Sequence, residues 1–202
     1  MHQNKEFANL VSLLESNIKE NITLGLVVAQ NYQKEFEAHF GCRIEEYEDM
    51  MAFLEPSVAW GQNPYWSYKP KIIKMKYLDL EFTNIHQIPK GIGMLKNLKI
   101  LILDYNYLRN LPKEIGKLEN LKRLFLNFNQ IIEIPKEIGQ LKNLEILDFD
   151  SNKITNIPLE ITDLKNLQKL FVSNNLIKAI PEEIKAMQYT QGLKIYADEG
   201  LL

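Results

Sequence analysis

Residues 98–120 read LKILILDYNYLRNLPKEIGKLEN, and residues 121–143 read LKRLFLNFNQIIEIPKEIGQLKN. The two stretches carry Leu, Asn, Pro, Ile and Gly at matching places, with an offset of 23 residues. The same register extends in both directions, so that five units without insertion fill the chain from Met75 to Tyr189. A fixed period of roughly 20 to 50 residues predicts a solenoid, in which each unit buries its apolar face only against its neighbours.

The first half of each unit predicts a short strand that ends in a polar turn. Apolar residues occupy the first, fourth and sixth places, as in Leu98, Leu101 and Leu103, and this alternation is typical of a strand. The ninth-place residues of the second to fifth units are Asn106, Asn129, Asn152 and Asn175. Because a buried amide must satisfy its donors and its acceptor, we expect these asparagines to form a ladder between neighbouring turns. Thr83 and Asp198 take this place at the two ends, which predicts a weaker ladder there.

The second half of each unit predicts a short helix or turn on the opposite side. A proline recurs in register at Pro89, Pro112, Pro135, Pro158 and Pro181. Proline fixes φ, lacks an N–H donor and is favoured at the start of a helix. The units therefore predict parallel strands about 4.8 Å apart on the inside of an arc, joined by right-handed connections.

The full pattern, L-x-x-L-x-L-x-x-N-x-I-x-x-I-P-x-x-I-x-x-L-x-N, resembles that of the leucine-rich-repeat family. Within that family it looks like the short bacterial and Ras-suppressor-like repeats, which carry L-P-x-x-I-G-x-L. The resemblance covers more than half of the chain. It implies an α/β solenoid, a right-handed arc with a parallel sheet on the concave side and short helices or turns on the convex side. It also implies binding to a protein or peptide on the concave face.

The chain divides near residue 70. Residues 71–202 hold five full repeats and a partial sixth, whereas residues 1–70 show helical spacing, as in Phe7, Leu10 and Ile18. We expect residues 1–70 to form a helical N-terminal capping region with an aromatic linker. The stretch 56–71, PSVAWGQNPYWSYKPK, predicts a loop that covers the open core of the first repeat. A separate aromatic ligand patch in this stretch is the alternative.

Composition limits the class of partner and the compartment. The 202 residues have a formal net charge of −2 and a pI near 6.0, which argues against nucleic acid as the main partner. Cys42 is the only cysteine, so no intramolecular disulfide forms and a reducing compartment is favoured. Residues 1–6 lack the apolar core of a secretory signal, and the longest apolar run, 24–29, is too short to span a membrane. These features predict a cytoplasmic protein, with export by a non-classical route as an alternative.

The sequence shows no constellation that predicts catalysis, a cofactor or a metal. His2, His39 and His86 are far apart and have no Cys or His at ligand spacing. There is also no nucleophile motif, P-loop or G-x-G-x-x-G. We therefore expect a non-enzymatic protein. The alternatives are a structural, self-assembling repeat protein and an enzyme with a site in residues 1–70.

The predicted binding surface lies between the leucines of each strand. The third, fifth, seventh and eighth places of six rows should face away from the core, and we name these 24 positions the sheet face. The predicted binding residues are Tyr77, Asp79, Glu81, Phe82, Ile100, Ile102, Asp104, Tyr105, Arg123, Phe125, Asn127, Phe128, Ile146, Asp148, Asp150, Lys169 and Phe171. The remaining positions are Ser151, Ser173, Asn174, Gly192, Lys194, Tyr196 and Ala197.

Aromatic and acidic residues dominate the sheet face. Seven of the chain's 20 aromatic residues fall on these 24 of 202 positions, an enrichment that favours an interaction site. The competing interpretation is that aromatic residues favour strands and pack on each other. The five acids predict a basic protein or peptide partner. The last strand has no partner beyond it, so we expect a monomer with weak self-association.

Overall fold

The computed structural model describes residues 75–202 and six single residues that precede them. These six residues are Lys34, Glu37, Arg43, Glu45, Tyr47 and Met50. Tyr47 and Met50 are buried in the same hydrophobic cluster as the repeats. Apart from these six residues, the helical cap predicted over residues 1–70 lies outside the described residues. The aromatic stretch 56–71, Cys42, His2 and His39 lie outside them too, and the two-part division of the chain stays a prediction.

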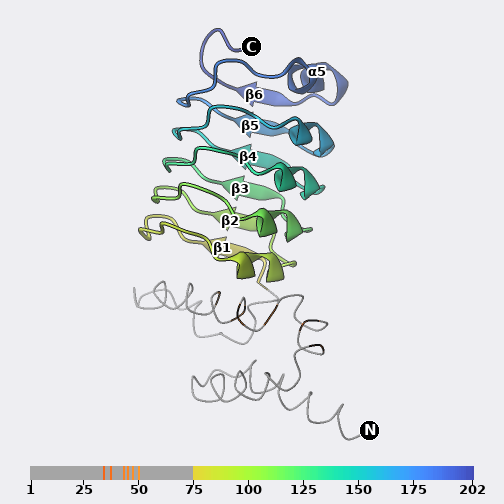
Figure 1. Ribbon diagram of the computed structural model, residues 1–202. Helices are drawn as coiled ribbons and strands as arrows, with labels where there is room; N and C mark the ends of the chain where they lie inside the picture. The colour runs from red at the N-terminus through yellow and green to blue at the C-terminus, as the bar shows by residue number, and fades with distance from the viewer. Residues whose placement is uncertain are drawn as a thin grey trace, which may run out of the picture.

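Six strands form one parallel sheet whose order follows the chain (Figure 1). The strands are β1 (Tyr77–Asp79), β2 (Ile100–Ile102), β3 (Arg123–Phe125), β4 (Ile146–Asp148), β5 (Lys169–Phe171) and β6 (Lys194–Tyr196). Each residue of β1 to β4 pairs with the residue 23 positions later, as Leu101 does with Leu124. One sequence unit is therefore one coil of the solenoid. The β5–β6 pair is offset by 25 residues, because Leu170 pairs with Ile195.

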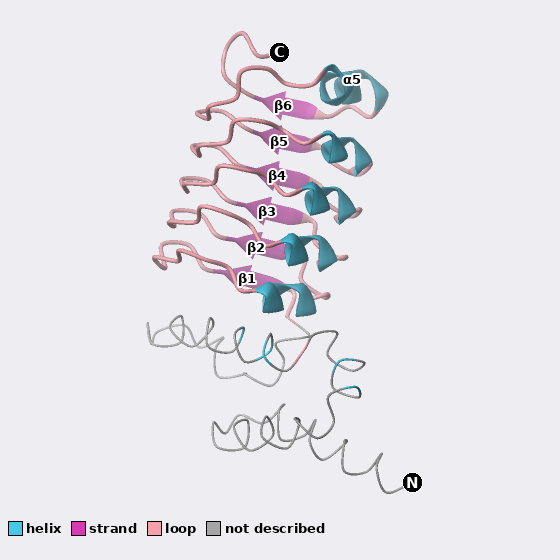
Figure 2. Cartoon of the chain, in the orientation of Figure 1, coloured by secondary structure: helices cyan, strands magenta, loops and turns pink. Residues whose placement is uncertain are grey.

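Short helices line a different side of the stack from the strands (Figure 2). They are the 3-10 helices η4 (Lys90–Met94), η5 (Lys113–Lys117), η6 (Lys136–Gln140) and η7 (Leu159–Asp163), and the α-helix α5 (Glu182–Thr190). Each of the five follows a proline of the repeat, as predicted, and the N-cap φ values at Pro89 and Pro112 are −70° and −68°. Proline is suited to this place because its fixed φ matches the entry to a helix.

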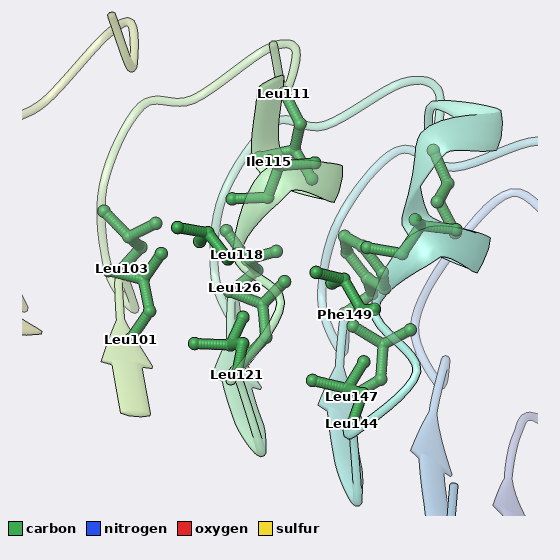
Figure 3. Packing of buried hydrophobic residues seen from close by; sticks show 14 of the residues in the cluster. Leu101, Leu103, Leu111, Ile115, Leu118, Leu121, Leu126, Leu144, Leu147 and Phe149 are labelled. Atoms are coloured by element: carbon green, nitrogen blue, oxygen red, sulfur yellow. The ribbon is translucent and has the colours of Figure 1, made fainter. Parts of the chain in front are cut away.

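The core is a continuous apolar column between the strands and the helices (Figure 3). Within one coil the strand residue Leu101 and the helix residue Ile115 both belong to this cluster and are fully buried. Phe149, also fully buried, takes the sixth place in the fourth coil. Each coil alone would leave these side chains in water, so contacts between neighbouring coils supply most of the stability.

The predicted asparagine ladder is confirmed. Asn129 donates from Nδ2 to the backbone oxygens of Leu103, Leu126 and Asn127, and its Oδ1 accepts the N–H of Leu108 at 3.0 Å. Asn106, Asn152 and Asn175 repeat this arrangement.

The two predicted end positions of the ladder carry Thr83 and Asp198 instead of asparagine. The Thr83 hydroxyl donates to the backbone oxygen of Leu80 at 2.6 Å and contacts the Asn106 amide oxygen at 3.3 Å. At the other end, Asp198 accepts the N–H of Asn174 at 2.8 Å. Asp198 does not take the ladder place, because the β5–β6 offset of 25 residues puts it level with Ser173, a seventh position. Thr83 does take that place, and among the described residues it forms fewer hydrogen bonds than each asparagine does.

Candidate functional site

The structure places the predicted binding residues on the outer side of the sheet. In every strand the middle residue is buried, and the residues on either side of it point away from the core. Among the 24 positions, Asp148 is the one buried residue, and its exposed fraction is 9%. The sixth row differs from the prediction, because the 25-residue offset puts Lys194 and Tyr196 at the third and fifth positions, in place of Gly192 and Lys194. Ala197, predicted to face outward, packs partly against the core. The sheet face is thus one continuous surface over six strands.

The eighth position of the first five coils has a left-handed backbone, which the repeat pattern did not predict. The φ values are 56° at Phe82, 55° at Tyr105, 51° at Phe128, 56° at Ser151 and 54° at Asn174. The backbone N–H here donates to the seventh residue of the next coil, as Phe128 does to the Asp150 oxygen at 3.1 Å. A residue with a Cβ in this conformation costs roughly 1–2 kcal/mol. Asn174 is the one clue in the sequence, because asparagine tolerates this region.

Aromatic rings at these positions form a stack across three coils. Tyr105 stacks on Phe82 with centroids 4.4 Å apart, and Phe128 stacks on Tyr105 at 4.5 Å. Their exposed fractions are 63% for Phe82, 41% for Tyr105 and 50% for Phe128. Strand propensity does not explain these three rings, since their positions lie beyond the strand ends and disfavour bulky residues.

A second ring pair lies within the strands. Phe171 of β5 and Tyr196 of β6 stack with centroids 4.3 Å apart and an interplanar angle of 6°. Phe125 of β3 is half-buried and pairs in register with Asp148 of β4, which in turn pairs with Phe171. Asp148 therefore lies between two aromatic positions, and this neighbourhood explains its burial.

The acids of the sheet face are held by backbone donors rather than by cations. Asp104 Oδ1 accepts the N–H of Asn127 at 2.7 Å, and Asp150 Oδ1 accepts the N–H of Ser173 at 2.6 Å. Asp148 accepts the N–H of Asp150 and the side-chain amide of Asn127, both at 3.1 Å. In the described part of the chain, neither these three carboxylates nor those of the first coil form an ion pair.

Burial shifts the titration of these carboxyl groups. Desolvation raises the pKa of Asp104 to about 6, against the opposing hydrogen bonds from Asn127, and neighbouring acids add to the rise. Desolvation also raises the pKa of Asp150 to about 6, with Asp148 and Asp198 contributing repulsion. The pKa of Asp148 is raised by the same burial. The sheet face therefore holds carboxylates that are short of favourable charge partners.

Cations occupy other parts of the surface. On the sheet face they stand at the third positions, where the strands begin, and these are Arg123, Lys169 and Lys194. Elsewhere, exposed lysines pair across coils, as Lys122 does with Glu145 at 2.6 Å and Lys96 with Glu119 at 3.5 Å. The cations thus stand where strands begin, in the third, fifth and sixth rows, whereas the acids stand in the first, second and fourth rows, at the fifth and seventh positions.

A pocket on another side of the molecule was missed by the sequence analysis. It has a volume of about 1030 Å³ and brings Arg43 and Glu45 next to the loops of the first two coils. His86, which stacks on Tyr107 at 5.0 Å, and Arg109 also line it. No sequence motif indicates this pocket, because it depends on how residues 43 and 45 lie against coils more than 40 positions away. No predicted binding residue lines it.

Two classes of site are absent from the described residues. They contain no group of three or more His, Cys, Asp and Glu side chains arranged to hold a metal ion. In the same part of the chain, every helix is too short or too polar to cross a membrane.

Comparisons with known proteins point to a single family. The family model described as a leucine-rich repeat region matches residues 61–131, and a second, described as a leucine-rich repeat, matches residues 119–177. No curated protein matches the chain.

Three solved structures illustrate the likeness. The ectodomain of the receptor kinase SOBIR1 from Arabidopsis thaliana is 34% identical with a TM-score of 0.52, over 59% of this chain and 67% of that one. The ectodomain of GASSHO1/SCHENGEN3 from Arabidopsis thaliana, in complex with CASPARIAN STRIP INTEGRITY FACTOR 2, is 34% identical with a TM-score of 0.51, over 55% of this chain and 14% of that one. The Leptospira interrogans protein LIC12759 is 38% identical over 60% of this chain and 36% of that one, with a TM-score of 0.45.

The share of each relative that is matched differs widely. The chain spans about a third of the Leptospira protein and about a seventh of GASSHO1/SCHENGEN3, but two thirds of the SOBIR1 ectodomain. The family matches, the 23-residue coils and the asparagine ladder all indicate a leucine-rich repeat. This chain belongs to the leucine-rich-repeat family.

Proposed function

We propose that this protein is a non-catalytic interaction module that binds a protein or peptide on its sheet face. The observation that carries the proposal is the exposed stack of Phe82, Tyr105 and Phe128. These rings sit where the backbone disfavours them and where water reaches them, so neither folding nor strand propensity accounts for their presence. Exposed aromatic residues surrounded by polar groups are typical of binding hot spots.

Two further features support this assignment. We infer that the sheet face is rigid, because its rows are fixed by strand pairing and, in the second to fifth coils, by the asparagine ladder at the strand end. A preformed surface loses little conformational freedom on binding, which favours affinity. In addition, a structure that resembles this chain, that of GASSHO1/SCHENGEN3, holds a bound factor. This likeness is an analogy of fold, and the argument for this chain rests on its own side chains.

Site-specific photo-crosslinking tests the proposal. A photoreactive phenylalanine analogue replaces Phe128 in one variant and Lys136, at the start of η6, in the other. Both full-length variants are irradiated in lysate of the native cell. We expect a discrete crosslinked protein from position 128 and none from position 136. A crosslink that forms at position 136 alone would assign binding to the helix side and refute the proposal.

A further inference from the structure

The aromatic stack of the eighth positions ends at Phe128. In the next coil this place is taken by Ser151, whose φ of 56° matches the 51° of Phe128. The fourth coil therefore offers the same backbone site without a ring. One face of the Phe128 ring packs on Tyr105, and no other ring of the described residues stacks on Phe128. The stack thus ends in an open ring face beside a small hydroxyl side chain.

A carboxylate stands beside this open place. Asp150 directly precedes Ser151, and its backbone oxygen accepts the Phe128 N–H at 3.1 Å, so that the two residues are neighbours across the coils. The hydrogen bond from Ser173 N–H to Oδ1, at 2.6 Å, fixes the position of the Asp150 carboxylate. Asp150 forms no ion pair with any described residue, and Asp148 and Asp198 add negative charge around it.

We propose that an arginine side chain of the protein partner occupies the place above Ser151, between the Phe128 ring and the Asp150 carboxylate. This inference rests on the proposed function of the sheet face and names the chemistry of the partner. A guanidinium is planar and stacks on aromatic faces within about 6 Å of the ring centroid. Neighbouring coils are about 4.8 Å apart. A guanidinium above Ser151 thus continues the stack at nearly the spacing that separates Tyr105 from Phe128, which is 4.5 Å.

The same geometry favours arginine over other groups. The N–H fork of a guanidinium can hydrogen-bond to a carboxylate while its face stacks on a ring, whereas an ammonium lacks the planar shape. An acidic side chain would meet repulsion from Asp148 and Asp150. A neutral aromatic side chain could extend the stack but would leave the Asp150 carboxylate without a charge partner.

The wider charge pattern indicates how the partner segment runs. Seventh-position acids recur along the stack at Glu81, Asp104 and Asp150, whereas the cations Arg123 and Lys169 stand at the beginnings of the strands. A basic segment is attracted to the line of strand ends and repelled from the strand starts. We therefore expect an extended, arginine-containing segment that crosses the coils along the seventh and eighth positions.

Three matched peptides probe the site. The peptides are blocked hexapeptides of alternating glycine with arginine, lysine or citrulline, and citrulline keeps the planar shape of arginine without its charge. Dissociation constants and amide NMR shifts are measured with the full chain at pH 7.5 and low salt. We expect saturable shifts at Phe128, Asp150 and Ser151, and binding of the arginine peptide about tenfold tighter than that of the citrulline peptide. Lysine should rank between them, and equal binding of arginine and citrulline would overturn the inference.

Single substitutions then locate the contact. Phe128→Asn removes the ring while keeping a residue that tolerates φ above zero, and Asp150→Asn keeps an oxygen that can accept the Ser173 N–H. Each should weaken the arginine peptide about fivefold or more. The matched control is Asp163→Asn, which changes the same charge on the helix side, where Asp163 pairs with Lys142. This control should change the dissociation constant less than about twofold. Equal losses in Asp150→Asn and Asp163→Asn would reduce the effect to overall charge and overturn the inference.

Failure of this inference is distinguishable from failure of the proposed function. If a crosslinked partner loses affinity in Phe128→Asn but keeps it in Asp150→Asn, the sheet face still binds protein and the arginine assignment is wrong. If that partner contacts position 128 through a segment with arginine and needs Asp150, both conclusions stand.

Discussion

The side-chain nitrogen of Asn129 donates a hydrogen bond to the backbone oxygen of Leu103 in the preceding coil, over 2.9 Å. Its side-chain oxygen accepts the N–H of Leu108 from the same coil. One buried amide, 7% exposed, therefore hydrogen-bonds backbone groups of two neighbouring coils at the strand ends, and the Leu103 oxygen is shared with the side-chain nitrogen of Asn106. These bonds between neighbouring coils explain why asparagine recurs every 23 residues in the sequence.

Replacing this amide should destabilise the solenoid. Asn129→Leu leaves the N–H of Leu108 buried without its partner and removes one of the two hydrogen bonds to the oxygen of Leu103, at a cost of about 1–3 kcal/mol in the free energy of unfolding. The control is Asn156→Leu, at an exposed position whose side chain bonds only to Thr155, where about 0.5 kcal/mol or less is expected. Denaturant melts of both variants measure the difference. Equal losses would show that the ladder does not stabilise the coils.

The short helices of neighbouring coils approach each other closely at their glycines, and this predicts how alanine substitutions change stability. A Cβ atom on Gly139 would lie 2.5 Å from the backbone oxygen of Glu160 in the next coil. On Gly93 the nearest atom would be the flexible Cδ of Lys117 at 2.9 Å, with the backbone oxygen of Glu114 at 3.0 Å. Gly139→Ala should therefore cost about 1–3 kcal/mol, and Gly93→Ala should cost less. The order of the two midpoints in urea decides this, and a reversed order would contradict the tight packing at Gly139.

Substitution of Phe149 should reduce the free energy of unfolding far more than substitution of Phe128. Phe149 is fully buried, so Phe149→Ala should lose about 3–5 kcal/mol of stability. Phe128→Asn loses a ring stack, worth about 0.5–1.5 kcal/mol, but relieves a strained left-handed backbone by a similar amount. Its free energy of unfolding should stay within about 1 kcal/mol of the unchanged protein. A loss as large as that of Phe149→Ala would show that the exposed stack holds the fold together.

The pKa of Asp150, raised by burial to about 6 from 3.8, predicts a pH dependence of stability. In the unfolded chain this carboxyl loses its proton near pH 4, whereas in the folded chain it keeps the proton up to about pH 6. The folded state binds more protons in this window, so the contribution of Asp150 to stability falls as pH rises from 4 to 6.

Asp150→Asn removes that contribution while keeping an acceptor for Ser173. Relative to the unchanged protein, the variant should therefore be more stable at pH 7.5 than at pH 4.5. Melting temperatures at the two pH values measure this, with Asp163→Asn as the exposed control. The prediction is wrong if the difference between variant and unchanged protein is the same at both pH values.

The sequence predicts the coil well because its features are local or repeat in register. The period placed Leu101, Asn106 and Pro112 correctly, since each residue type has one suitable place in a coil. The left-handed backbone at Phe128 could not be predicted, because an aromatic residue is not typical of this conformation. Asn174, at the same position of a later coil, is a residue type that tolerates it. The raised pKa of Asp148 depends on rings from the two neighbouring coils, and no single unit encodes it.

The predicted weak self-association would use the free edge of the last strand. β6 pairs with β5, and its other edge has no strand partner among the described residues. Such an edge can recruit a second chain. Light scattering across a concentration series should show a monomer with weak association that Tyr196→Lys, at an exposed position of β6, abolishes. A tight dimer that this substitution leaves intact would assign self-association to another surface.

The claim that the sheet face binds a protein partner is tested most directly by one pair of dissociation constants. Calorimetry measures how tightly the purified partner binds two double variants. One is Phe125→Ala with Phe128→Ala on the sheet face, and the other is Lys113→Ala with Lys136→Ala on the helix side. The double phenylalanine variant should bind at least about thirtyfold more weakly, equivalent to about 2 kcal/mol, while still melting cooperatively. The lysine variant should bind as the unchanged protein does. Unchanged affinity in the folded phenylalanine variant, with loss in the lysine variant, would contradict the account.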